Sequence, residues 1–342
     1  MNIKGYVSIL LGAVLWMGCG SEKEPHDPIS YLNYVDPQII ASAEKFFTAL
    51  PDEAKSVDFE SSFDRVKLGR KLYLDNRLSK NGNQSCNTCH NLDTYGVDNL
   101  PTSPGDKGEN GERNSPTTLN AALHFVQFWD GRSPHVEDQA GGPIVNPVEM
   151  AMPSEEYVVN RLKGIEDYQT SFTKAFPKDD DPITYDNLKI ALGAFERTLL
   201  TPSRFDEFMQ GNTEALTKKE IAGLDAFVKT GCTTCHTGAL LGGGMYQPFG
   251  VYGDYWTYTK SEKIDEGRFV VTGNESDKYV FKVPSLRNIE KTAPYFHDGS
   301  IASLEKAILI MAKSQLNKEL NAEEVENIAA FLKSLTGETP GV

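Results

Sequence analysis

The chain has 342 residues, of which 39% are hydrophobic and 24% are charged, and its formal net charge is -14 at pH 7. This length corresponds to about two domains of roughly 150 residues, and the composition excludes a wholly disordered chain, a collagen-like repeat and a polytopic membrane protein. The excess of acidic residues argues against a basic nucleic-acid-binding surface, so we expect no nucleic-acid partner.

The N-terminus has the pattern of an export signal. Lys4 precedes an uncharged, largely apolar run that ends at Cys19 and is too short for a comfortable membrane span. The Gly-Cys junction is similar to a bacterial lipoprotein cleavage site. It predicts residues 1–19 as signal peptide, Cys19 as the acylated N-terminus, residues 20–36 as a tether, and a periplasmic, membrane-anchored protein. Trp16 is unusual near such a site, which leaves ordinary cleavage or an uncleaved anchor open.

The other four cysteines form two Cys-x-x-Cys-His motifs. Two thiols three positions apart can each add to a vinyl group of one haem, and the next histidine can bind the iron. Two disulfides or one four-ligand zinc site would be the alternative, but neither needs both histidines. The sequence therefore predicts two covalently bound haem c groups, held by Cys86, Cys89 and His90 and by Cys232, Cys235 and His236.

Apolar residues at helical spacing predict a mostly helical chain. Thr217 with Glu220, and Asn321 with Glu324, form capping boxes that open two of the helices. Long alternating runs typical of strands are missing from the sequence, while glycine-rich loops are frequent. We therefore expect an all-α fold with long loops that can wrap a cofactor. The predicted helices are 38–50, 62–74, 116–124, 154–163, 165–176, 185–200, 218–229, 303–315 and 322–335.

An internal repeat follows each Cys-x-x-Cys-His motif. Residues 116–131 contain PTTLN and, after seven residues, FWDG, and residues 284–299 contain PSLRN and, after seven residues, FHDG. Such a match is what duplication of one haem-binding unit would leave. We therefore predict two homologous cytochrome c-like domains, at 37–202 and 203–342.

The two copies differ in ways that suggest different tasks. Met311 follows the second copy on a predicted helix, and a thioether opposite the proximal histidine would raise the haem potential and close the iron to small ligands. Spacing alone fits a packed core methionine equally well. The first copy carries Trp129 and, further on, Glu149 instead.

The stretches RNSPTTLNAA, QFWDGR, EDQAGGP, NPVEM, KVPSLRN and TAPYFHDGS resemble the bacterial dihaem cytochrome c peroxidases, a family that also contains the MauG-type protein-modifying enzymes. The resemblance runs from about residue 60 to the C-terminus. It implies a low-potential peroxidatic haem on His90 and a high-potential haem, ligated by His236 and Met311, where electrons enter. It also implies Trp129 between the haems, Gln139 and Glu149 in the peroxide pocket, and a calcium ion between the domains near Asn114, Thr292 and Pro294.

The implied activity is reduction of hydrogen peroxide to water with electrons from a small cytochrome c or cupredoxin, and homodimers occur in the family. The residue types suit this chemistry. A partly desolvated carboxylate such as Glu149 can move a proton between the peroxide oxygens, Gln139 can orient the peroxide, and Trp129 is an oxidisable bridge. A MauG-like oxidase of a protein or organic substrate is one alternative, although the MauG type has Tyr at the position of Met311. A non-catalytic dihaem electron carrier is the other.

One position departs from the family pattern. Many members carry a histidine on a mobile loop that caps the peroxidatic iron until the other haem is reduced, and Asp106 occupies that position here. Asp is a poor sixth ligand for haem iron. We therefore expect the His90 haem to be five-coordinate or water-bound when oxidised, so that turnover needs no reductive activation. Among the alternative internal ligands, His124 fits a packed core position, His135 a surface helix start, and His297 a hydrogen-bonding role near the second haem.

Overall fold

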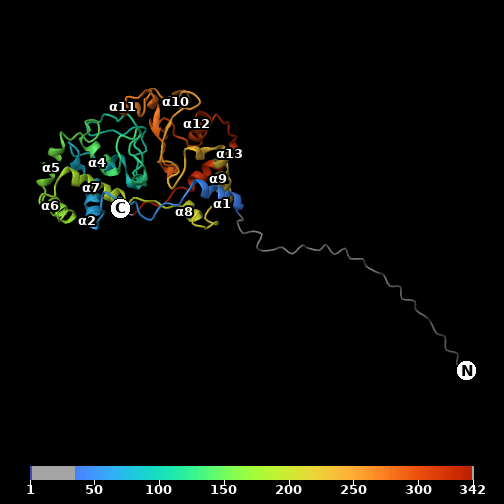
Figure 1. Cartoon of the computed structure of the whole chain (residues 1–342), viewed down its shortest axis with the longest axis horizontal. Coiled ribbons are helices and arrows are strands. Elements are labelled where there is room, and N and C mark those ends of the chain that lie inside the picture. Colours follow the sequence, from blue (N-terminus) through green and yellow to red (C-terminus); the bar gives the residue numbers. More distant parts are fainter. Residues whose placement is uncertain (2–34, 341–342) are drawn as a thin grey trace. The chain divides into compact units, whose positions relative to one another are not determined.

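The structure is a computed structural model that describes Met1 and residues 35–340. The predicted signal peptide beyond Met1, its Cys19 and almost all of the predicted tether lie outside the described residues. Within the described part, no helix has the length and apolar character needed to cross a membrane. The chain from Val35 onward is one compact unit (Figure 1).

Two helix crossings of the same design organise this unit. Helix α2 (Phe63–Tyr73) crosses α7 (Tyr185–Glu196), and α9 (Lys218–Thr230) crosses α13 (Ala322–Lys333). A glycine stands at each crossing point. A Cβ on Gly69 would lie 1.9 Å from the carbonyl oxygen of Ala191, and the corresponding distance from Gly223 to that of Asn327 is 1.8 Å. Only glycine allows the backbones to approach this closely.

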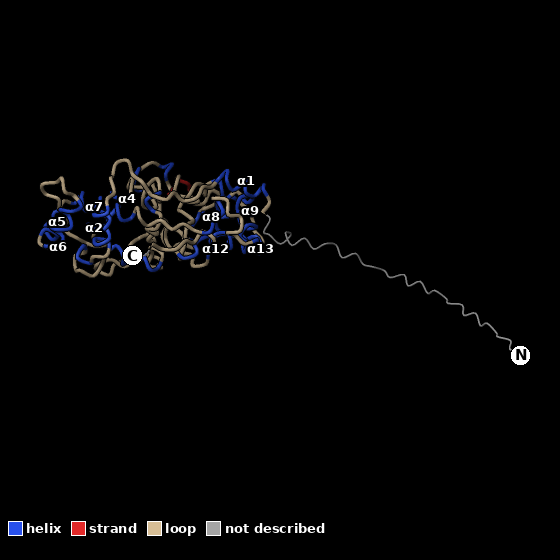
Figure 2. Tube along the Cα trace, turned by 90° about the horizontal axis from the view of Figure 1, so that it is seen from below, coloured by secondary structure: helices blue, strands red, loops and turns tan. Residues whose placement is uncertain are grey.

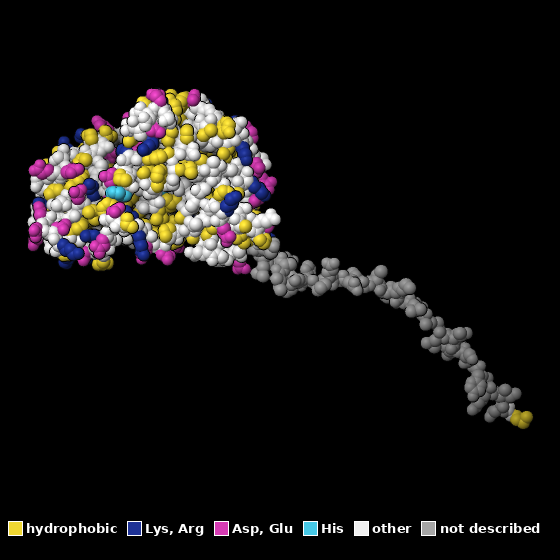
Figure 3. Space-filling model, viewed as in Figure 1, with side chains coloured by type: hydrophobic (Ala, Val, Ile, Leu, Met, Phe, Trp, Pro, Cys, Tyr) yellow, Lys and Arg dark blue, Asp and Glu magenta, His cyan; other side chains and the backbone are white. Residues whose placement is uncertain are grey.

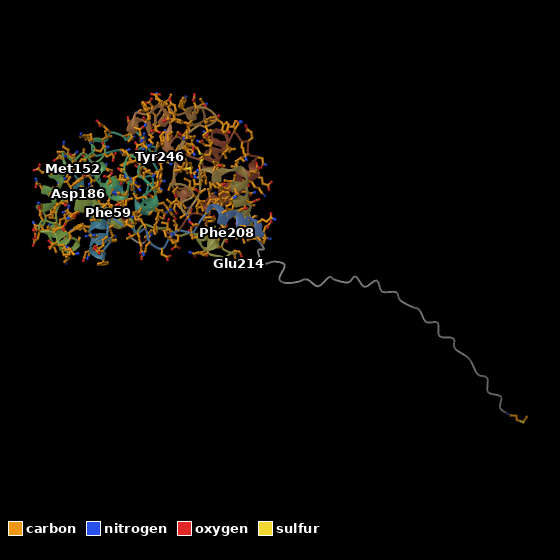
Figure 4. The ribbon with its side chains drawn as sticks, in the orientation of Figure 1. Phe59, Met152, Asp186, Phe208, Glu214 and Tyr246 are labelled. Atoms are coloured by element: carbon orange, nitrogen blue, oxygen red, sulfur yellow. The ribbon has the colours of Figure 1, made fainter. Side chains whose placement is uncertain are left out.

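Each crossing lies in its own hydrophobic core. The first core gathers side chains of α2, α4 (Val136–Val145), α5 (Glu155–Lys163), α6 (Glu166–Ala175) and α7, and the second gathers those of α1 (Pro37–Phe46), α8 (Arg204–Met209), α9, α12 (Leu304–Leu316) and α13. The same two groups of helices lie apart in Figures 1 and 2. Figure 4 labels one buried residue of each core, Met152 and Phe208.

The N-terminal helix belongs to the second core. Ala43 of α1 is fully buried there, and the ring of the following Phe47 lies 5.8 Å from that of Phe205. The N-terminal helix therefore packs in the second core, although it precedes the residues of the first core in the sequence. The predicted domain boundaries, which follow sequence order, remain a prediction.

The rest of the described fold is short elements and loops. A two-stranded antiparallel sheet pairs β1 (Tyr246–Pro248) with β2 (Val280–Lys282) and is the red segment of Figure 2. The short helices are α3 (Cys86–Cys89), α10 (Tyr255–Thr259) and α11 (Phe269–Thr272). The predicted all-α class, with two cytochrome c-like domains, is confirmed.

Most of the predicted helices are present, but the one at 116–124 is wrong. Only Ala121–Leu123 form a single 3-10 turn there, because Asn120 has a φ of +60° and its backbone N–H donates to the carbonyl of Leu199 rather than to a helical partner. Helix α4 was missed, since Gly141, Gly142 and Pro143 lie within it and glycine and proline ordinarily oppose helix formation.

The internal repeat is visible in the backbone. Asn120 and Asn288 both have positive φ, +60° and +58°, and their side-chain amides both donate to the hydroxyl of Thr201, at 2.7 and 2.8 Å. Each copy then closes with one antiparallel bridge, between Gln127 and Ser133 in the first and between Tyr295 and Ile301 in the second. Equivalent residues thus take equivalent conformations, as duplication of one unit predicts.

We expect Gly69→Ala and Gly223→Ala to lower the free energy of unfolding of the haem-loaded protein by about 1–3 kcal/mol, because the added methyl group forces the crossing backbones apart. Gly164→Ala is the matched control, since its Cβ would meet its nearest neighbour at 3.4 Å. Denaturant unfolding measures all three. Unchanged stability in both crossing variants would contradict the close-packed crossings.

Candidate active site

A cavity of about 1360 Å³ lies against the first Cys-x-x-Cys-His motif. It exceeds the roughly 300–1000 Å³ of ordinary small-molecule pockets. The predicted catalytic and haem-binding residues of the first half all line it, namely Cys86, Cys89, His90, Trp129, Gln139 and Glu149. Residues spread over more than 60 positions are therefore brought to one space, which suits a large cofactor with a substrate beside it.

The first motif is held in a fixed turn. Helix α3 spans its two cysteines, and the backbone N–H of His90 donates to the carbonyl of Cys86 at 2.9 Å. The hydroxyl of Tyr73 donates to the carbonyl of His90 at 2.6 Å. Desolvation lowers the pKa of His90, which keeps its imidazole neutral, the form that binds iron.

The second motif repeats this turn. The backbone N–H of His236 donates to the carbonyl of Cys232 at 3.0 Å, and desolvation lowers the pKa of this histidine as well. Its Nδ1 lies 2.8 Å from the carbonyl oxygen of Leu241, so Nδ1 carries the proton and Nε2 is left for a metal. Met311 is half-buried on α12 in the same half of the fold. Its ligation of the second iron remains a prediction.

The four cysteines do not gather at one position. Cys86 packs against the first hydrophobic core and Cys232 against the second. Among the described residues, no group of three His, Cys, Asp or Glu side chains converges on a metal position. A zinc site shared by the four cysteines is therefore excluded, and the two motifs stay in separate halves.

Glu149 has the surroundings of a proton-transferring carboxyl group. Burial raises its pKa, although the charge of Arg132 and a hydrogen bond from the Asn146 amide to Oε1, at 2.7 Å, both oppose this rise. Arg132 itself lies over the ring of Phe128, 3.4 Å from its centroid. A buried carboxyl group with a raised pKa is suited to accept a proton and to return it.

Trp129 lies where the two halves meet. Its indole N–H donates to the carbonyl of Asn114 at 2.9 Å, and its ring faces His297, the equivalent residue of the second repeat, with the ring centroids 6.4 Å apart. His297 is buried and stacks on Phe281 at 4.3 Å. Equivalent positions of the two repeats thus place an oxidisable indole ring beside an imidazole ring.

The Asp106 side chain is hydrogen-bonded to another loop residue and does not line the cavity. Its two carboxylate oxygens accept hydrogen bonds from the backbone N–H of Asn81, at 3.0 Å, and from the amide of the same residue, at 2.7 Å. Its backbone N–H donates to the carbonyl of Glu149 at 2.7 Å. The neighbouring Gly105 approaches so closely that a Cβ would lie 1.7 Å from the carbonyl oxygen of Val148. Asp106 therefore fastens its loop to the segment that carries Glu149.

The predicted calcium residues offer neutral oxygens. Asn114 is nearly buried, its amide donates to the carbonyl of Leu100 at 3.0 Å, and its backbone N–H donates to the carbonyl of His297 at 2.7 Å. Asn99 donates to the carbonyl groups of Lys291 and Ala293, the residues that flank Thr292. Carbonyl and amide oxygens suit calcium, but no carboxylate cluster accompanies them in the described residues, so the calcium ion remains a prediction.

An ion cluster joins the halves beside Trp129. Arg113 binds Asp130 at 2.6 Å and Asp265 at 2.6 Å, and Arg132 binds Asp130 at 2.9 Å. Sequence reasoning missed this cluster because Asp265 lies outside both repeat motifs. On the outer face shown in Figure 3, positive and negative side chains are interspersed.

Glu196 is a second buried carboxyl group at the cavity that the sequence did not reveal. It is 4% exposed, and burial together with the nearby Glu137 raises its pKa to about 8. Glu137 is different, because Arg197 binds both of its oxygens, at 2.7 and 2.9 Å. Glu196 therefore keeps its proton at neutral pH, while Glu137 is paired with Arg197.

Comparison with known proteins gives a consistent result. The family model "Di-haem cytochrome c peroxidase" matches residues 63–214, and the model "Cytochrome c" matches residues 220–336. The cytochrome c551 peroxidase of Nitrosomonas europaea is 46% identical over 81% of this chain and 81% of its own length, and that of Pseudomonas aeruginosa is 44% identical over 88% and 87%. A crystal structure described as a MauG-like protein associated with microbial copper homeostasis superposes with a TM-score of 0.75 at 31% identity, covering 84% of this chain and 94% of that one.

The raised pKa of Glu196 has a consequence for stability. The folded protein keeps the proton up to about pH 8, whereas the unfolded chain releases it near pH 4.5, so stability falls as pH rises between these values. We expect Glu196→Gln to flatten this fall and to be more stable than wild type at pH 8. Exposed Glu156→Gln is the control, and denaturant unfolding at several pH values is the measurement. A variant that follows the wild-type pH dependence would contradict the assignment.

Proposed function

Since the chain belongs to the di-haem cytochrome c peroxidase family, we propose that it reduces hydrogen peroxide to water at the His90 haem, with electrons that enter at a haem ligated by His236 and Met311. The observation that carries this proposal is the convergence of His90, Glu149, Gln139 and Trp129 on one cavity. Bound haem would supply an iron that receives peroxide and relays electrons.

The side chains at the cavity divide the work. Glu149 accepts the proton of the inner peroxide oxygen and returns it to the outer oxygen, which leaves as water. Gln139 orients the peroxide by hydrogen bonding from α4. Overall, peroxide takes up two electrons and two protons and yields two waters, the electrons arriving in two one-electron steps through Trp129. The hydrogen bond from the Trp129 N–H to Asn114 fixes the indole in this position.

The donor and the setting complete the proposal. We propose a small periplasmic cytochrome c or cupredoxin as donor, and attachment of the protein to the membrane by a lipid on Cys19. Asn114, Thr292 and Pro294 would hold a calcium ion, which would stiffen the junction between the halves. A homodimer is proposed on the family resemblance alone.

Glu149→Gln should lower the rate of peroxide turnover by about 10²–10⁴-fold, because the amide cannot accept the proton. In the wild type, the rate should fall as the pH drops through the raised pKa of Glu149. Arg132→Met removes the cation that lowers the pKa of Glu149, so the fall in rate at low pH should begin at a higher pH. Steady-state assays with a reduced cytochrome give both results, with Glu156→Gln as control. Unchanged turnover in Glu149→Gln would favour an electron carrier over a peroxidase.

Turnover should begin without a lag when the reaction is started from fully oxidised protein. The reason is that Asp106 is bound to Asn81 and does not line the cavity, so it would not ligate an iron held by His90. Stopped-flow traces of oxidised and pre-reduced protein compare the two cases. A lag that only pre-reduction abolishes would contradict the proposed open site.

A further inference from the structure

Lys282, the last residue of β2, is a buried cation without an anion. It is 4% exposed, and its Nζ lies 2.9 Å from Nδ1 of His124. Asp130 is the acidic side chain whose charge acts on it, but Arg113 and Arg132 already bind that carboxylate. None of the ion pairs formed by the described residues includes Lys282. Buried lysines are rare unless they are paired, because the desolvated charge is costly.

The contact with His124 uses only part of the ammonium group. Desolvation, aided by the charge of Lys282, holds the pKa of His124 well below its usual range, so this ring is neutral and its Nδ1 accepts one hydrogen from Nζ. An ammonium group carries three donors, and no other hydrogen bond of this Nζ is found within the described residues. The burial also lowers the pKa of Lys282 to about 7. An adjacent anion would reverse that shift and use the remaining donors.

Lys282 and His124 both line the cavity that contains Cys86, Cys89 and His90. Lys282 is fixed there from the second half of the fold, since its backbone N–H donates to the carbonyl of Trp129 at 2.8 Å. Two other cations of the cavity wall already have acidic partners, Arg113 in the ion cluster and Lys263 in its pair with Glu112. A haem carries two propionate carboxylates, which are anions of the kind that this ammonium group lacks.

We propose that Lys282 binds a propionate carboxylate of the His90 haem and that His124 is the positioning residue that aims its ammonium group. This inference rests on the proposed attachment of a haem in this cavity. It means that the second half of the fold supplies a counter-ion to the haem of the first. A cation beside a haem opposes the extra positive charge of the oxidised iron, so Lys282 raises the potential of the His90 haem.

The test is a redox titration of the protein loaded with both haems, together with resonance Raman spectra of the propionate bending modes. Lys282→Met should shift the midpoint potential of the His90 haem to a more negative value and move one propionate mode. Lys282→Arg should stay closer to wild type in both. His124→Leu, which leaves the charge in place, should move the same propionate mode. The matched control is Lys263→Met, which removes an exposed cation from the same cavity and should change neither readout.

A fully loaded Lys282→Met protein with the wild-type potential and the wild-type propionate modes would overturn the inference. If Lys282→Met does not fold, Lys282→Gln replaces it in both measurements. Wild-type potential and wild-type propionate modes in Lys282→Gln would likewise overturn the inference. Neither measurement uses peroxide. A protein that lacked peroxidase activity but showed the shift would therefore contradict the proposed function and leave this inference standing.

Discussion

The fold depends on two helix crossings in which a glycine lets one backbone touch another. At Gly69 and at Gly223 the crossing helix comes so close that any side chain would collide with a carbonyl group. This contact fixes α2 against α7 and α9 against α13, and each Cys-x-x-Cys-His turn follows the first helix of its pair. The two helix pairs are alike, and the loops that follow them share details of conformation. Asn120 and Asn288 both have positive φ, and both donate a hydrogen bond to Thr201. The two units could then diverge in side chains while the backbone stayed the same.

Some of the differing residues lie where the two units meet. The repeat places Trp129 of one copy against His297 of the other, and Arg113, Asp130 and Asp265 bind across the same junction. Buried ion pairs of this kind add little net stability, but breaking one of them is costly because a charge is left unpaired. They therefore fix the relative position of the halves more than they strengthen the fold. The relative position of the halves therefore determines how the side chains of Trp129 and Lys282 line the cavity of the first half.

The sequence predicts the parts of this protein that are encoded locally. The capping boxes at Thr217 and Asn321 mark helix starts correctly, and the spacing of the two cysteine motifs predicts two covalently bound haem groups. Residues that act through distant partners could not be found in this way. Lys282 and His124 are 158 positions apart, Glu196 looks like any helical glutamate, and Asp106 gives no hint that Asn81 binds its carboxylate. The helix at 116–124 was predicted wrongly for the same reason. The backbone N–H of Asn120 donates to the carbonyl of Leu199, which is remote in the sequence.

We propose that the two haem sites have divided their tasks, one iron being open to small ligands and the other closed by a ligand from its own chain. Cyanide titration of the fully oxidised protein distinguishes the two sites, because cyanide binds ferric haem only where a position is free or weakly held. We expect one cyanide per chain, bound at the His90 haem, with the spectrum of the His236 haem unchanged. Binding of two cyanide ions, binding of none, or binding at the His236 haem would contradict it.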